Sequence, residues 1–124
     1  MSPAFLDDDW VAGLVGAELP GVDATVAVTV GGAGRSDVTV RLVVAGGTVR
    51  EAARTPAPDA AVTFSLDADD ARAVLDGMLD PSVAYMQGRM KTAGDLGLVL
   101  AVLAATATDA WRAARVALAA TTDG

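Results

Sequence analysis

The sequence contains no cysteine and no histidine, and these absences exclude much of the chemistry that small domains perform. Without cysteine there is no disulfide, no thiolate nucleophile and no thiolate metal ligand. Without histidine, the commonest general base and metal ligand is missing as well. No serine or carboxylate stands in a recognisable catalytic context. We therefore expect a protein that is not an enzyme, has no catalytic residues and binds neither a metal nor a cofactor.

Positive charge and aromatic side chains are also scarce. Lys91 is the only lysine, there are five aromatic residues, and the formal net charge is −7. A surface this acidic repels nucleic-acid phosphates and anionic membranes. No basic patch or aromatic run is available to bind or stack bases, so we expect no nucleic-acid partner.

The chain is rich in residues with apolar aliphatic side chains. Hydrophobic residues make up 52% of the 124 positions, enough for one domain spanning residues 1–124. The most apolar run covers residues 96–105, whereas a helix that crosses a bilayer needs about 20 apolar residues. The N-terminal stretch has neither the positive region nor the apolar region of a signal peptide. These features predict a cytoplasmic protein without stable membrane insertion.

The first half of the chain alternates apolar and polar residues in the manner of a sheet. Residues 3–19 have apolar positions near helical spacing and predict a helix that ends at Pro20. Residues 22–30 then alternate strictly, with the valines facing inward and Ala27 facing outward. A second alternation over 38–44 leads through Gly46-Gly47, a two-residue hairpin signal, to a third strand over 48–52. Residues 60–66 predict a fourth strand.

The second half is mainly helical. Asp67 suits the N-cap of a helix that Gly77 ends, with Met78 continuing the apolar face. A short helical turn over 80–86 precedes a fifth strand over 87–95. Two helices follow over 96–107 and 109–120; in the second, Trp111, Ala114 and Leu118 are predicted to face inward, and Arg112 and Arg115 outward. The fold class is therefore α+β, with a five-stranded, mainly antiparallel sheet covered on one face by helices.

Three local features admit a functional and a structural interpretation. The glycines of residues 31–34 lead into a strand and lack the Lys-Ser/Thr ending of a phosphate loop, so a plain loop is favoured. The aspartates of residues 7–9 suit a helix N-terminal turn better than a cation site. Arg89 and Lys91 share one strand face and could attract an anionic head group, although the solvated face of an edge strand is the favoured interpretation.

One long segment carries a resemblance to a known family. Residues 75–98 read Leu-Asp-Gly-Met-Leu-Asp-Pro-Ser-Val-Ala-Tyr-Met-Gln-Gly-Arg-Met-Lys-Thr-Ala-Gly-Asp-Leu-Gly-Leu. This run resembles the signature of the sterol carrier protein-2 family, in which a helix end is followed by Asp/Asn-Pro, an aromatic pair, Gln-Gly-Lys/Arg and a Leu-rich helix. The order of the remaining elements fits over most of residues 20–107.

The resemblance implies a sheet and C-terminal helices that enclose an apolar tunnel for a sterol, fatty acid, fatty acyl-CoA or phospholipid. It places at the tunnel Tyr85, Met86 and Gln87, with Gln87 nearest a ligand head, and Leu98, Val102 and Leu103 on the covering helix. With the apolar faces described above, the predicted ligand-binding residues are Phe64, Met78, Tyr85, Met86, Gln87, Leu98, Val102, Leu103 and Trp111. Ala93 stands where the family often has a third basic residue, which weakens the case for acyl-CoA.

Three functions remain in competition on these grounds. The first is a carrier of a hydrophobic ligand. The second is an accessory protein or enzyme that acts on an apolar biosynthetic intermediate held in the same cavity. The third is a packing or regulatory domain whose cavity has collapsed. The lack of histidine and cysteine favours the first over the second.

Overall fold

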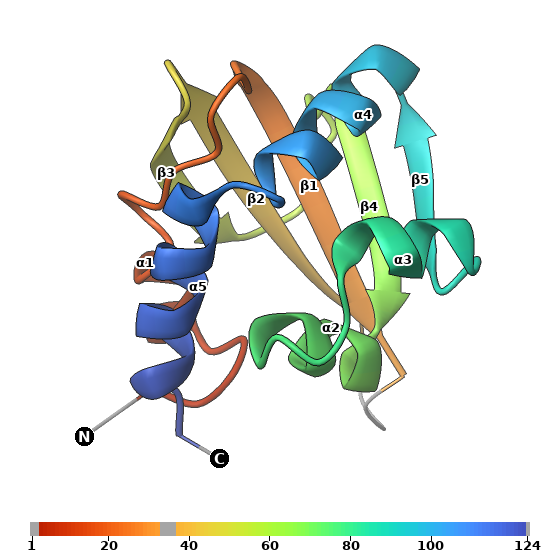
Figure 1. Ribbon diagram of the computed structural model, residues 1–124. Helices are drawn as coiled ribbons and strands as arrows, with labels where there is room; N and C mark the ends of the chain where they lie inside the picture. The colour runs from red at the N-terminus through yellow and green to blue at the C-terminus, as the bar shows by residue number, and fades with distance from the viewer. Residues whose placement is uncertain (1–2, 33–36, 124) are drawn as a thin grey trace.

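The computed structural model describes residues 3–32 and 37–123 as a five-stranded sheet with five helices (Figure 1). The elements in chain order are α1 (Asp8–Ala12), β1 (Ala24–Gly31), β2 (Val38–Ala45), β3 (Thr48–Arg54), β4 (Val62–Asp67), α2 (Ala68–Leu75), α3 (Pro81–Met86), β5 (Met90–Gly94), α4 (Leu96–Ala105) and α5 (Asp109–Ala120).

The sheet has the strand order β3-β2-β1-β4-β5. Three of the neighbouring pairs are antiparallel, and the central pair of β1 with β4 is parallel, which confirms a mainly antiparallel sheet. Helices α2 to α5 lie in front of the sheet in Figure 1 and leave its far face open. The predicted fold class is confirmed.

The hairpin between β2 and β3 forms where the sequence predicts it. Gly46 and Gly47 have φ values of 60° and 78°, so both turn positions are left-handed. Glycine adopts such angles without the steric penalty that a Cβ atom brings, and the resulting turn matches the twist of the two strands. Ala45 therefore pairs directly with Thr48.

The N-terminal helix is much shorter than predicted. Helix α1 covers only Asp8–Ala12, and Leu6 before it has a φ of 69°, which a right-handed helix cannot include. Gly13 caps the helix and a series of turns follows. The apolar spacing of residues 3–19 thus belongs to a segment of turns around the short helix α1, whose Trp10 and Val11 are buried.

The core lies between the helices and the covered face of the sheet. Its buried residues include the predicted inward-facing Val26, Val40, Val62 and Phe64. Ala27, which the alternation predicts to face solvent, is only 2% exposed. It lies on the central strand between Arg41 and Thr63 of the neighbouring strands, where a methyl group is short beside the side chains that flank it.

The remaining helices begin at residues suited to capping. The carboxylate of Asp80 accepts a hydrogen bond from the Ser82 amide, and that of Asp95 accepts one from the Leu98 amide. Asp67 occupies the predicted N-cap of α2, but its side chain accepts no such bond. Strand β5 is shorter than the predicted span 87–95, since Gly88 adopts a positive φ and β-pairing begins at Met90. Of the predicted glycine loop at 31–34, residues 33 and 34 lie outside the described residues.

Within the described ranges, no single helix has the length and apolar character to cross a membrane. Helices α4 and α5 reach that length and composition only as a pair, and they are bent by 71° relative to each other.

Candidate functional site

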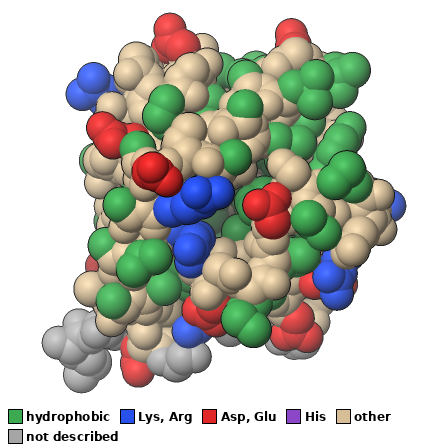
Figure 2. Space-filling view, in the orientation of Figure 1, with side chains coloured by type: hydrophobic (Ala, Val, Ile, Leu, Met, Phe, Trp, Pro, Cys, Tyr) green, Lys and Arg blue, Asp and Glu red, His purple; other side chains and the backbone are tan. Residues whose placement is uncertain are grey.

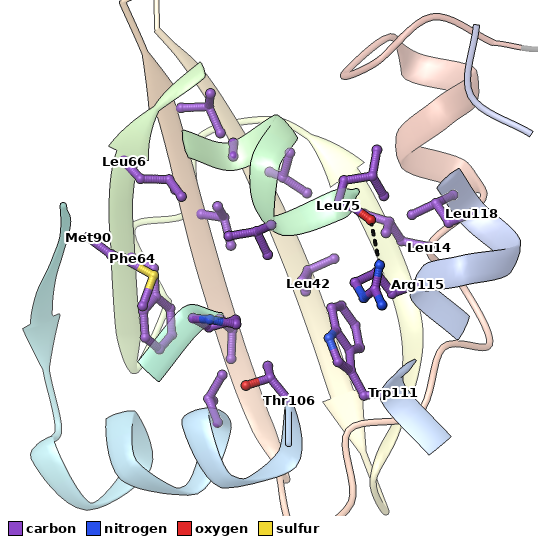
Figure 3. Close-up of a pocket in the computed structure, with 18 of the residues that line it drawn as sticks. Leu14, Leu42, Phe64, Leu66, Leu75, Met90, Thr106, Trp111, Arg115 and Leu118 are labelled. Atoms are coloured by element: carbon purple, nitrogen blue, oxygen red, sulfur yellow. Dashed lines mark hydrogen bonds between the residues drawn. The ribbon is translucent and has the colours of Figure 1, made fainter. Parts of the chain in front are cut away.

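An apolar cavity of about 200 Å³ lies between the sheet and the helices (Figure 3). Figure 2 shows a hollow on the helix-covered face, with hydrophobic side chains inside it and both basic and acidic side chains around it. The lining residues are Phe5, Leu6, Trp10, Leu14, Leu19, Val26, Val28, Val30, Val40, Leu42, Phe64, Leu66, Ala71, Val74, Leu75, Pro81, Met90, Val102, Leu103, Thr106, Trp111, Arg115 and Leu118.

The floor of the cavity is the covered face of the three central strands. Alternate residues of a strand point to the same side, so β1 contributes Val26, Val28 and Val30. Val28 is opposite Val40 on β2 and Phe64 on β4, and all three line the cavity. The strict alternation in the sequence therefore produces one continuous apolar floor.

Helices and the N-terminal segment form the walls. Helix α4 contributes Val102 and Leu103, and α5 contributes Trp111 and Leu118. In the N-terminal segment, the rings of Phe5 and Trp10 pack edge to face, with centroids 4.8 Å apart. The indole Nε1 of Trp10 donates a hydrogen bond of 2.8 Å to the Thr122 hydroxyl, which joins this segment to the end of α5.

Apart from the two tryptophans, only Thr106 and Arg115 among the described lining residues have polar side-chain atoms. The Thr106 hydroxyl donates to the Leu103 carbonyl at 2.7 Å, which is typical of a satisfied helix-end threonine. Arg115 projects from α5 beside Trp111 and donates from Nη1 to the Leu75 carbonyl at 2.9 Å (Figure 3). No carboxylate is present among the described residues of the lining.

Four of the nine predicted ligand-binding residues line this cavity: Phe64, Val102, Leu103 and Trp111. The other five do not. Tyr85 and Leu98 pack against the core from outside the lining, and Met78, Met86 and Gln87 are exposed.

The exposed position of Met78 has a local cause. Gly77 adopts a φ of 77° and ends α2, so the helical face predicted through Leu75 does not continue to Met78, which is 82% exposed. Leu79, one residue later, is buried instead. Met86 lies at the end of α3 and is 76% exposed.

Lys91 lies on the edge strand β5 and Arg89 in the turn just before it, and both are outside the cavity lining. The Arg89 Nε is 3.7 Å from the Asp70 carboxylate, and its Nη1 donates to the Gln87 side-chain oxygen at 3.3 Å. Lys91 is exposed. This placement agrees with the favoured interpretation of a solvated edge.

The prediction that Arg115 faces outward is wrong. Residues 111, 115 and 118 are spaced by four and three, so they share one helix face, and that face meets the cavity. The spacing to Trp111 was the available signal, but a charged side chain on an amphipathic helix is normally assigned to solvent. Arg112 lies on another face of the helix, outside the lining, as predicted. Its Nη1 is 3.4 Å from the Asp109 carboxylate.

The strongest ion pair of the described residues lies on the open face of the sheet, away from the cavity. Arg41 and Asp59 form a double hydrogen bond, with Nε to Oδ1 at 3.0 Å and Nη2 to Oδ2 at 2.6 Å. These bonds hold the pKa of Asp59 below its usual value and raise the pKa of Arg41. Within residues 3–32 and 37–123, no cluster of acidic side chains is arranged to hold a metal ion.

Comparison with known structures identifies the fold. A protein from Thermus thermophilus described as possibly a sterol carrier protein has a TM-score of 0.70 and 17% identity, with 99% of this chain and 95% of that chain covered. A crystal structure of sterol carrier protein 2 has a TM-score of 0.70 and 21% identity, covering 90% and 97% of the two chains. Palmitated SCP2L2 from Aedes aegypti has a TM-score of 0.60 and 15% identity, covering 71% and 76%.

Sequence comparison gives the family. No curated protein sequence matches the chain directly. The profile of the SCP-2 sterol transfer family, however, matches residues 14–106, which include the sheet, helices α2 to α4 and most of the cavity lining. Family membership supports lipid binding or transfer as the general function. The chain belongs to the SCP-2 sterol transfer family.

Proposed function

We propose that this protein carries a single-chain lipid, with the chain of the lipid held in the apolar cavity between the sheet and helices α4 and α5. The observation that carries this proposal is the cavity itself, whose lining is apolar apart from Thr106 and Arg115. Within the lining, Phe64, Val102, Leu103 and Trp111 are proposed as ligand contacts.

The size of the cavity favours a slender ligand. Pockets for drug-sized molecules commonly have volumes of about 300–1,000 Å³, whereas this one has about 200 Å³. A flexible acyl chain can follow a narrow space, while the rigid fused rings of a sterol would require α4 or α5 to move away from the sheet. The Aedes aegypti neighbour is described as palmitated, and palmitate belongs to the favoured class.

Two alternatives receive less support. An acyl-CoA carries several phosphates, and the basic residues nearest the family signature, Arg89 and Lys91, lie outside the cavity lining. An enzymatic role needs groups that can transfer protons or attack a substrate, and no observation at the cavity favours one. A collapsed domain is disfavoured because the cavity is present between packed helices and the sheet.

The proposal is tested by purifying the protein, recording its native mass spectrum before and after delipidation, and measuring the melting temperature of the delipidated protein with added ligands. Laurate, cholesterol and a phospholipid serve as probes. We expect laurate to raise the melting temperature more than cholesterol does. If no apolar probe raises it and no lipid co-purifies, the proposed function is wrong.

A further inference from the structure

Among the described residues, the cavity lining contains one charged side chain, and its position calls for an explanation. Arg115 lies on the inner face of α5 and is half-buried beside Trp111, Leu75 and Leu118. Its guanidinium carries a permanent positive charge. A charge bordering an apolar space is unfavourable unless an opposite charge or hydrogen-bond acceptors compensate it.

The protein itself supplies one acceptor. Nη1 donates to the Leu75 carbonyl, which is at the C-terminal end of α2, where a positive charge is favoured. The guanidinium also lies directly over Gly77, where a Cβ atom added to the glycine would be 2.8 Å from Nη1. A purely structural role as a cap of α2 would account for this one bond.

That one bond leaves most of the N–H donors of the Arg115 guanidinium unoccupied. A guanidinium has five N–H donors, and the Leu75 carbonyl occupies one of them. Arg41, Arg72, Arg89 and Arg112 each contact an aspartate within 4.0 Å, and the exposed Arg50 and Arg54 contact none of the described ones. Arg115 is the arginine in the described lining, and in the described part of the chain no carboxylate lies within 4.0 Å of it. Arg115 is therefore the cavity's unneutralised cation.

A second donor lies one helical turn earlier. The indole N–H of Trp10 is bonded to Thr122, whereas that of Trp111 bonds to none of residues 3–32 and 37–123 and is not sealed from solvent. Figure 3 shows Trp111 and Arg115 projecting side by side from α5 toward the cavity. Thr106 cannot add a third donor, because its hydroxyl proton is directed to the Leu103 carbonyl.

We propose that Arg115 is the head-group site of the cavity, and that it selects single-chain lipids with an acidic head, a carboxylate above all, over neutral lipids of the same chain length. Two N–H groups of a guanidinium match the two oxygens of a carboxylate. The tail then lies along the floor formed by Val28, Phe64 and their neighbours. This inference rests on the proposed function and adds a head-group specificity to it.

The test compares two probes that differ only in the head group, laurate and dodecanol. Binding to delipidated protein is measured by isothermal titration for the wild type, Arg115→Gln and Arg112→Gln. Glutamine at 115 retains a neutral donor for the Leu75 carbonyl. Arg112 is a matched control, since it is an arginine on the same helix with a side chain that is 56% exposed and outside the lining.

We expect wild-type protein to bind laurate at least about tenfold more tightly than dodecanol, a difference of about 1.4 kcal/mol that is typical of a charge-assisted hydrogen bond. Arg115→Gln removes this preference and changes dodecanol affinity by less than about threefold. Arg112→Gln leaves both affinities as they are.

Each contrary result has its own meaning. If neither probe binds the wild type, the proposed function itself fails. If both bind but with equal affinity, or if Arg112→Gln loses the preference as fully as Arg115→Gln, the carrier function stands and the assignment of Arg115 is wrong. Should Arg115→Gln fail to fold, nuclear Overhauser contacts in the wild type decide: contacts between the laurate protons next to the carboxylate and the Arg115 side chain support the site, and their absence overturns it.

Discussion

Filling the cavity floor at Val28 should separate ligand binding from folding. Val28 is half-buried at the centre of β1, opposite Val40 and Phe64, and its side chain borders the cavity. In Val28→Phe, the added ring occupies part of the cavity volume. The usual cost of overpacking, about 1–3 kcal/mol, applies to a core that is already full.

The magnitude follows from the cavity volume. At about 24 cal/mol per Å³, a dry cavity of this size costs about 5 kcal/mol, compared with about 5–15 kcal/mol for the whole stability of a small domain. This cost is an upper limit, since the hollow opens to water. The empty Val28→Phe protein should therefore melt at the same temperature as the wild type or higher.

The second quantity to compare is the rise in melting temperature when laurate binds. A ligand at about 100 times its dissociation constant adds about 2.7 kcal/mol. The unfolding entropy of a chain of 124 residues is about 260 cal/mol/K, so laurate should raise the wild-type melting temperature by about 10 °C. Val28→Phe should reduce this rise to nearly zero.

The matched control is Val43→Phe. Val43 is a half-buried valine on β2 whose side chain lies outside the cavity lining, between Thr25 and Glu51 on the neighbouring strands. We expect this variant to keep the full laurate response in differential scanning calorimetry. A Val28→Phe protein that retains the wild-type response, or a Val43→Phe protein that loses it equally, would refute the assignment of the cavity as the ligand site.

Two further predictions concern stability. Gly94→Ala should destabilise the fold by about 1–3 kcal/mol or more in urea unfolding, because Gly94 has a φ of 112° and a Cβ atom there would press on the Ala61 carbonyl; Gly46→Ala, with open space around its Cβ, should cost less, and equal losses would contradict this reasoning. Asp59→Asn should lower the melting temperature at neutral pH, and the difference from the wild type should vanish in acid. The reason is that the hydrogen bonds from Arg41 lower the folded-state pKa of Asp59. The stabilisation is therefore present above the unfolded-state pKa and is lost as the pH falls through the folded-state pKa. A difference that is constant with pH would assign the effect to something other than this ion pair.

The sheet could be predicted from the sequence because its signals are local. Strict alternation marks β1 and β2, and the Gly46-Gly47 turn places β3 beside β2. The floor of the cavity follows from the same alternation, which is why Phe64 could be predicted. On α4 and α5, the predicted ligand contacts Val102, Leu103 and Trp111 do line the cavity, and their contact with a ligand stays a prediction.

The failures occurred where tertiary packing overrides local pattern. The apolar spacing of residues 3–19 is helical, yet a positive φ at Leu6 precedes the helix and Gly13 caps it, so α1 has five residues. Periodicity through α2 includes Met78 only if Gly77 continues the helix, which it does not. Arg115 is hardest to predict, because an arginine faces a cavity only when an acceptor such as the Leu75 carbonyl meets it there, and that acceptor is 40 residues away in the sequence.

The position of the last two helices in the topology also has a consequence for motion. Strand β5 completes the sheet at Gly94, so α4 and α5 can separate from it without breaking any strand pairing. Three hydrogen bonds join α5 and the residues after it to the rest of the fold: the Asp123 amide to the Pro3 carbonyl at 2.9 Å, the Trp10 indole to the Thr122 hydroxyl, and the Arg115 guanidinium to the Leu75 carbonyl. Amide protons of α4 and α5 should consequently exchange with solvent through one shared partial opening, at a lower free energy than those of β1. The segment around α1 and the residues after α5 thus hold the cavity closed on one side, although both are remote in sequence from the family signature.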